Sequence, residues 1–228
     1  MDRTKRDFLN RKEEVEEYFL FLKILNNDNI SIKYTHGREE KEKNISNKLQ
    51  RIFIANSFLI LYNIIESTVR NSIIEIYDKI KDDGIGYQNL SHNLQKIWVN
   101  QKIDNLKEGA FNHSTLQSNI QNIADNILTQ EIIILSSDNI DISGNIDAQK
   151  IRELADRFGF EKSRDGRYLE DIKKKRNRLA HGEQTFHDIG KDFSFNQLND
   201  FKENTFDYLE NVIEKIEVFL EREEYLAR

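Results

Sequence analysis

A short segment late in the chain combines two residue types with complementary chemistry. Residues 173–181 read KKKRNRLAH, a dense run of cations that also carries an amide at Asn177 and an imidazole at His181. A guanidinium such as that of Arg176 binds phosphate oxygens through a planar fork of N–H donors. An imidazole donates or accepts a proton near neutral pH. The segment therefore predicts either a site where a phosphate-bearing ligand is bound and a proton is transferred, or an ordinary solvated basic helix end.

The helix predicted over residues 167–181 places these groups on defined faces at about 100° per residue. Its apolar stripe consists of Leu169, Ile172, Leu179 and Ala180. Arg176 falls in the middle of that stripe, whereas Asn177 and His181 share its shoulder because they are four residues apart. Lys173 lies beside them. Because a guanidinium in an apolar stripe needs polar partners, Arg176 is a candidate functional residue.

A second polar set lies on the long helix predicted over residues 45–82. Between Ile52 and Val69 this segment is apolar almost all round, which is typical of a central buried helix. The polar exceptions fall within about 80° of one another on the helix, and they are Asn56, Asn63, Glu66 and Arg70. We expect Glu66, supported by Asn63, to lie within ion-pair or water-bridged reach of Arg176. A solvated face or an interhelical hydrogen-bond ladder would produce the same stripe.

The composition favours an all-α protein. The 228 residues include no proline, so long helices meet no breaker. A formal net charge of −6 argues against broad electrostatic binding of nucleic acid. The absence of cysteine excludes disulfides, thiolate metal ligands and cysteine nucleophiles, and it suits a reducing cytosol. The chain opens on charged residues, and its apolar run 52–65 is too short to span a bilayer. We therefore expect a cytoplasmic protein that binds no membrane.

The organisation along the chain indicates one helical bundle. Helices are predicted at about 5–26, 45–82, 91–106, 114–130, 147–158 and 167–181, and a long amphipathic helix starts near Ser194. The polar residues 27–43 are interpreted as a loop. Residues 131–146 carry β-branched runs between turn formers, which predicts a small hairpin or a packed loop. We expect a single domain over 1–228, in which 45–82 and 167–225 form the bundle core and about 83–147 is an insertion.

The sequence resembles a known family at three places: ILYNIIESTVRNSI (60–73), ISGNIDAQKIRELADRFGF (142–160) and RNRLAHGEQTF (176–186). They are similar to the MAE_28990/MAE_18760-type group of HEPN domains, small prokaryotic proteins regarded as ribonucleases. Arg176 and His181 match the Arg-x4-6-His motif of these domains, and Asn177 matches the polar residue that commonly follows the arginine. The resemblance covers roughly residues 45–225.

The resemblance implies an antiparallel HEPN bundle with metal-independent endoribonuclease activity. It also implies a homodimer whose two motifs face each other, acting as a toxin or a phage-defence effector with an antitoxin or defence-system protein as partner. Glu66 stands where such proteins often carry an acidic residue on an early helix. Glu183 replaces the tyrosine found two residues after the histidine in toxins that a nucleotidyltransferase silences, which argues against that regulation.

The types of these residues are consistent with this chemistry independently of the family resemblance. Cleavage of RNA by its own 2′-hydroxyl needs a base, an acid and a cation that stabilises the phosphorane. Two copies of His181 across a dimer supply base and acid, Arg176 binds the phosphate, and Asn177 holds the 2′-hydroxyl or positions His181. The sequence has no aspartate-rich cluster and no histidine pair at ligand spacing, so neither a metal nor another cofactor is expected.

Two alternatives stay open at this point. Residues 154–159, LADRFG, resemble the turn of a DNA-binding helix-turn-helix, although the recognition helix would contain the helix-breaking Arg164-Asp165-Gly166. The second alternative is a HEPN domain that only binds a partner protein or RNA.

Overall fold

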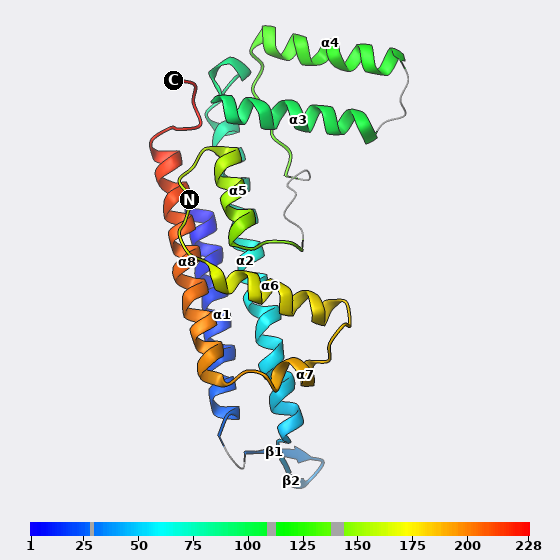
Figure 1. The fold of residues 1–228 in the computed structure, drawn as a ribbon, viewed down its shortest axis with the longest axis vertical. Helices are drawn as coiled ribbons and strands as arrows, with labels where there is room; N and C mark the ends of the chain where they lie inside the picture. The colour runs from blue at the N-terminus through cyan, green and yellow to red at the C-terminus, as the bar shows by residue number, and fades with distance from the viewer. Residues whose placement is uncertain (28–29, 109–112, 138–143) are drawn as a thin grey trace.

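A computed structural model describes residues 1–27, 30–108, 113–137 and 144–228 as an elongated helical bundle (Figure 1). Three long helices run side by side along its length: α1 (Asp2–Leu25), α2 (Asn47–Asp82) and α8 (Phe195–Glu221). Both later helices start at a serine that accepts a hydrogen bond from the first turn, Ser46 for α2 and Ser194 for α8. The prediction of an all-α fold is confirmed.

Shorter helices complete the bundle. They are α3 (His92–Glu108), α4 (His113–Thr129), α5 (Ala148–Phe158), α6 (Arg167–Ala180) and α7 (Phe186–Gly190), with a 3-10 turn η1 at Tyr87–Asn89 before α3. Helices α3 and α4 project sideways from one end of the bundle, and α6 crosses its middle (Figure 1). Helix α2 packs against α1, α6, α7 and α8, so it is the central element that positions α6.

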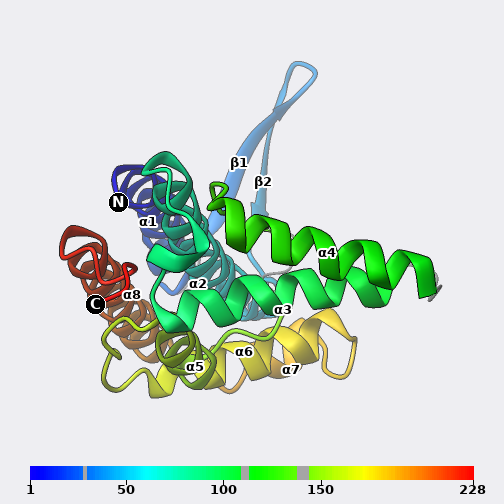
Figure 2. The same ribbon diagram turned by 90° about the horizontal axis from the view of Figure 1, so that it is seen from above.

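The β structure lies where a loop was predicted. Strands β1 (Ser31–His36) and β2 (Glu39–Asn44) form an antiparallel hairpin within the supposed loop 27–43. The hairpin projects from the side of the bundle opposite to α6 (Figure 2). In the segment 131–146, Ile132 makes an isolated β-bridge to Gly86. The second half of the hairpin expected there falls on residues 138–143, which lie outside the described residues.

The core is formed mainly by α2 and the helices around it. Its largest fully buried side chains include Tyr62, Phe58 and Trp98. Among the described residues, α2 has the length and composition to cross a bilayer, with a mean hydropathy of 1.5 over 18 residues, and half of that window is buried inside the bundle. The run 52–65 is part of a longer helix that continues to Asp82, so its shortness does not exclude a membrane span, contrary to the expectation from the sequence. Its packing against four helices is that of a bundle core.

Candidate functional site

Helix α6 carries the candidate residues on the face predicted from its sequence. Leu169, Ile172 and Leu179 are buried, whereas Ala180 is exposed. Arg176 is partly buried between them, and the centre of its guanidinium lies 4.4 Å from the centroid of the Tyr62 ring on α2. This is a cation–π contact, and it stabilises the guanidinium on an otherwise apolar stripe.

Asn177 fixes the orientation of the guanidinium. The Nη1 of Arg176 donates a hydrogen bond of 2.9 Å to the Oδ1 of Asn177. The hydroxyl of Tyr62 accepts a hydrogen bond of 3.0 Å from the buried N–H of Ile146, which holds the ring beneath Arg176. Burial raises the pKa of Tyr62, and the nearby Glu66 adds to this while the Ile146 N–H and Arg176 oppose it. Tyr62 is therefore a neutral platform for Arg176.

Glu66 lies near Arg176 without forming an ion pair with it. The Oε1 of Glu66 accepts a hydrogen bond of 2.8 Å from the N–H of Gly144. A Cβ at Gly144 would stand 3.6 Å from the Nη1 of Arg176, so the Gly144 backbone approaches both side chains. Of the two expected arrangements, a direct ion pair or a water-bridged approach, the direct ion pair is not formed, because the N–H of Gly144 binds the carboxylate and the ring of Tyr62 contacts the guanidinium.

The structure gives the other two supporting candidates different partners. The Oδ1 of Asn63 accepts a hydrogen bond of 2.7 Å from Arg11 of α1, so Asn63 joins two bundle helices and is not brought to Arg176. Lys173 forms a largely buried ion pair with Asp147, the N-cap residue of α5. Burial raises the pKa of Asp147, but hydrogen bonds from Lys173 and from the N–H groups of Lys150 and Gln149 outweigh it and hold the pKa below its usual value.

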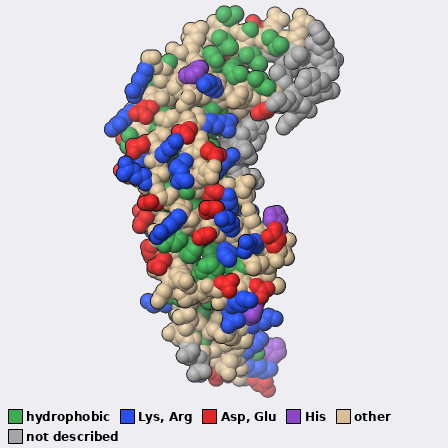
Figure 3. Space-filling model, in the orientation of Figure 1, with side chains coloured by type: hydrophobic (Ala, Val, Ile, Leu, Met, Phe, Trp, Pro, Cys, Tyr) green, Lys and Arg blue, Asp and Glu red, His purple; other side chains and the backbone are tan. Residues whose placement is uncertain are grey.

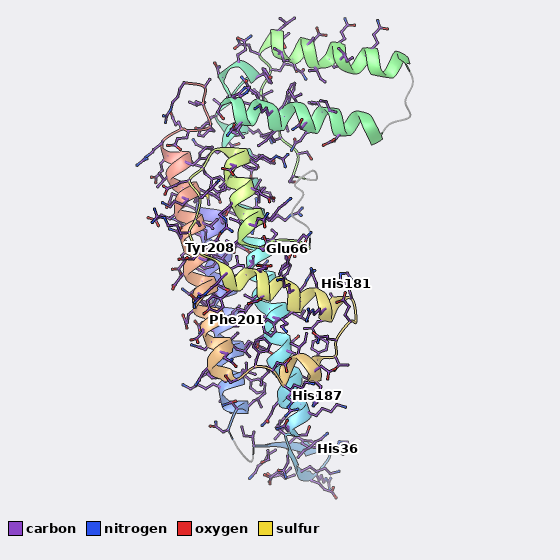
Figure 4. The ribbon with its side chains drawn as sticks, in the orientation of Figure 1. His36, Glu66, His181, His187, Phe201 and Tyr208 are labelled. Atoms are coloured by element: carbon purple, nitrogen blue, oxygen red, sulfur yellow. The ribbon has the colours of Figure 1, made fainter. Side chains whose placement is uncertain are left out.

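His181 stands at the free end of α6 (Figure 4), where its exposed side chain extends into solvent. The chain reverses directly after it, because Gly182 adopts a left-handed conformation with φ 70°. The N–H of Gly182 donates to Leu179 and that of Glu183 to Arg178, the two bonds of a Schellman motif. This motif explains why the helix ends here and leaves the imidazole accessible one helical turn from Asn177.

Two residues that hold the candidate site in place, Tyr62 and Asp147, were not predicted from the sequence. Tyr62 has the sequence signature of a core residue in an apolar helix, and its one further signal is an aromatic ring four residues before Glu66. Asp147 precedes a predicted helix, as an N-cap does, but its pairing with Lys173 depends on the crossing of α5 and α6.

Two further features of the described structure bear on other kinds of site. Within the described ranges, no three His, Asp or Glu side chains gather closely enough to hold a metal ion. A cleft of about 720 Å³ lined by residues including Arg164, Tyr208 and Asn211 lies at the N-terminal end of α6. At about 1.5 Å per residue, that end of the 14-residue helix is about 20 Å from His181. On the face seen in Figure 3, cationic and anionic side chains are interspersed over the bundle.

The comparison with known families decides the assignment. The family model for MAE_28990-like HEPN domains matches residues 2–225, nearly the whole chain. The chain belongs to the MAE_28990-like HEPN family. The match extends from α1 to the end of α8, so it includes α1, which the resemblance in the sequence did not cover. No curated protein and no solved structure matches this HEPN chain significantly.

Proposed function

We propose that this HEPN protein is a metal-independent endoribonuclease whose site is formed by Arg176, Asn177 and His181. One observation carries the proposal: an oriented guanidinium, with no carboxylate paired to it in the described structure, lies five residues before an exposed imidazole at the end of the same helix. A guanidinium oriented in this way retains N–H donors that suit a phosphate.

The roles follow from the reaction. The 2′-oxygen of a ribose attacks the adjacent phosphorus while a base removes its proton, and the bond to the 5′-oxygen breaks as an acid protonates that oxygen. Arg176 stabilises the charge that develops on the phosphorane. The products are a 2′,3′-cyclic phosphate and a free 5′-hydroxyl.

The arrangement needs two imidazoles, so we place two copies of the chain at one site. His181 of one subunit acts as base and its counterpart as acid, with the ends of both α6 helices at the interface of a homodimer. In the cell, the protein would act in the cytoplasm as a toxin or a phage-defence effector, held in check by an antitoxin or another protein of the same system.

Cleavage of a labelled RNA by matched variants tests the proposal. Arg176→Ala and His181→Ala should each lower cleavage by at least about a hundredfold, as loss of a transition-state contact or of a general acid or base does. Arg178→Ala is the matched control for the arginine, because Arg178 is on the same helix but points away and bonds to Gln184. His92→Ala, at the start of the distant α3, is the control for the histidine.

Both controls should cleave as the wild type does. Full activity of the His181→Ala variant would contradict the proposed site. RNA binding without cleavage by the wild type would instead indicate a non-catalytic HEPN module. A helix-turn-helix finds little support, because residues 159–166 separate α5 from α6, whereas that motif uses a turn of about three to four residues.

A further inference from the structure

The β1–β2 hairpin has two chemically different faces. Residues that pair across an antiparallel hairpin project to the same side, so the register sorts its side chains. One side, termed the tyrosine face, carries Ile32, Tyr34, His36, Glu39, Lys41 and Lys43. The other side, termed the glutamate face, carries Ser31, Lys33, Thr35, Glu40, Glu42 and Asn44.

The two faces differ in how their charges are arranged. On the glutamate face, two glutamates outnumber the single Lys33, and the carboxylate of Glu42 accepts a hydrogen bond from the hydroxyl of Ser31. On the tyrosine face the lysines stand opposite uncharged side chains, Lys41 across from Tyr34 and Lys43 across from Ile32. The Nζ of Lys41 is 3.7 Å from Glu39 in an exposed ion pair, and Lys43 has no ion-pair partner in the described part of the chain. The tyrosine face is therefore an aromatic surface flanked by cations.

The bundle leaves this face in solvent. Tyr34 is 46% exposed and Ile32 is 48% exposed, and the hairpin projects away from the helices (Figure 2). A two-stranded hairpin is marginally stable by itself. Core packing therefore does not account for an aromatic ring beside two lysines of the neighbouring strand.

We propose that the tyrosine face binds single-stranded RNA, with Tyr34 stacked on an unpaired base and Lys41 and Lys43 on the flanking phosphates. Such a platform of an aromatic ring and cations is how proteins bind single strands, and phosphates complement the excess of lysine over glutamate on this face. The inference rests on the proposed function and deepens it by naming single-stranded RNA as the substrate class.

Helix α2 sets the distance between the two sites. It begins directly after the hairpin and carries Tyr62, the ring beneath Arg176. At about 1.5 Å per residue, the path from Ser46 to Tyr62 is about 24 Å long. A stacked strand rises about 3.4 Å per nucleotide, so about seven nucleotides cover this axial path alone. More are needed to reach Tyr34, because the hairpin projects from the side of the bundle opposite to α6. The hairpin thus holds a part of the strand remote from the scissile bond.

The test of this inference measures binding of a labelled RNA of about 20 nucleotides, which is long enough to span both sites at this rise. Every variant is placed in a His181→Ala background, which prevents cleavage. Tyr34→Ala should weaken binding about five- to a hundredfold, which is the range for loss of one stacked base. Lys43→Ala should reduce the slope of log affinity against log salt by about 0.7, the value for one phosphate contact on a single strand. Thr35→Ala and Lys33→Ala, neighbours on the glutamate face, are the matched controls and should bind as the parent does.

The outcomes separate this inference from the proposed function. Equal losses from both faces, or no loss from Tyr34→Ala, would overturn it, even if the wild type cleaves RNA through His181. A loss confined to the tyrosine face would support it, even if the wild type cleaves no RNA. A duplex of the same sequence should bind Tyr34→Ala and its parent equally, because its bases are already stacked; an equal loss with duplex would contradict single-strand recognition.

Discussion

At the scale of single residues, the site depends on how Arg176 is held. A guanidinium has five N–H donors, and the hydrogen bond to Asn177 uses one of them. The contact with Tyr62 stabilises the cation through the face of the ring and uses none. A direct ion pair with Glu66 would have neutralised the charge that a phosphate requires. Within the described residues, the aromatic platform thus stabilises Arg176 without pairing it to a carboxylate, which leaves it able to bind an anion.

Replacing Tyr62 separates the platform from the hydroxyl. Tyr62→Phe keeps the ring but leaves the buried Ile146 N–H without its acceptor, which should lower the free energy of unfolding by about 1–3 kcal/mol. Tyr62→Leu also removes the ring beneath Arg176. We expect kcat/KM for RNA to be about tenfold lower for the leucine variant than for the phenylalanine variant, which corresponds to the strength of a partly buried cation–π contact. Equal values in both proteins would show that the cation–π contact does not position Arg176.

The ion pair between Asp147 and Lys173 should make stability depend on pH. The folded-state pKa of Asp147 lies below its usual value, so the contribution is present above the unfolded pKa of about 3.9 and is lost as pH falls through the folded pKa. Asn caps helices as well as Asp, so Asp147→Asn removes mainly the pair. We expect a loss of about 1–2 kcal/mol at pH 7.

Urea unfolding of both proteins between about pH 7 and pH 3 measures this difference. It should begin to shrink below about pH 3.9, where the carboxyl of the unfolded chain takes up a proton, and it should disappear as the pH falls through the lower folded pKa. A difference that stays constant over the whole range would exclude the ion pair as its source.

At the scale of elements, the end of α6 is the critical local structure. Gly182 has a φ of 70°, and a Cβ at this position would have no other atom within 4 Å, so conformation rather than space requires glycine there. Gly182→Ala should lower the free energy of unfolding by about 1–2 kcal/mol, the cost of a left-handed non-glycine residue. Cleavage should fall more than stability explains, because His181 adjoins this turn. Thermal unfolding and cleavage at one temperature test this, and unchanged stability would contradict it.

The helices could be predicted from the sequence because their signals are local. Hydrophobic periodicity and caps located α2 and α8, and the positions of Arg176, Asn177 and His181 on α6 followed from its period. The hairpin was missed because the strands at 31–44 carry charge on both faces and bury neither, so they lack the usual alternation. Helix α7 was missed because it is short and depends on packing: a Cβ on Gly190 would stand 1.9 Å from the carbonyl oxygen of Arg51 on α2.

The partners of the candidate residues could not be predicted either. Whether Glu66 pairs with Arg176 or with a backbone N–H depends on where the Gly144 backbone runs, and Gly144 is far from both in sequence. The helical wheel correctly put Glu66 and Arg176 in one region, but it contains no information about a third segment.

At the scale of the whole molecule, the proposed site requires two subunits. Light scattering at micromolar concentration should give a mass of about 54 kDa, twice the 27.1 kDa of the chain. An excess of the inactive double variant Arg176→Ala/His181→Ala should reduce wild-type cleavage beyond simple dilution, because mixed dimers contain one intact motif. A strict monomer, or cleavage unaffected by the inactive subunit, would contradict the two-subunit site.

The most direct measurement of the central claim is the chemistry of the cut ends. The wild type is incubated in EDTA with an RNA and with the same RNA carrying a 2′-O-methyl group at the scissile nucleotide, and the products are analysed by mass spectrometry. We predict a 2′,3′-cyclic phosphate and a 5′-hydroxyl from the first RNA, no cleavage of the second at that position, and no product with His181→Ala. A requirement for magnesium, cleavage at the 2′-O-methyl nucleotide, or activity that survives the loss of His181 would show that residues 173–181 are only a basic helix end.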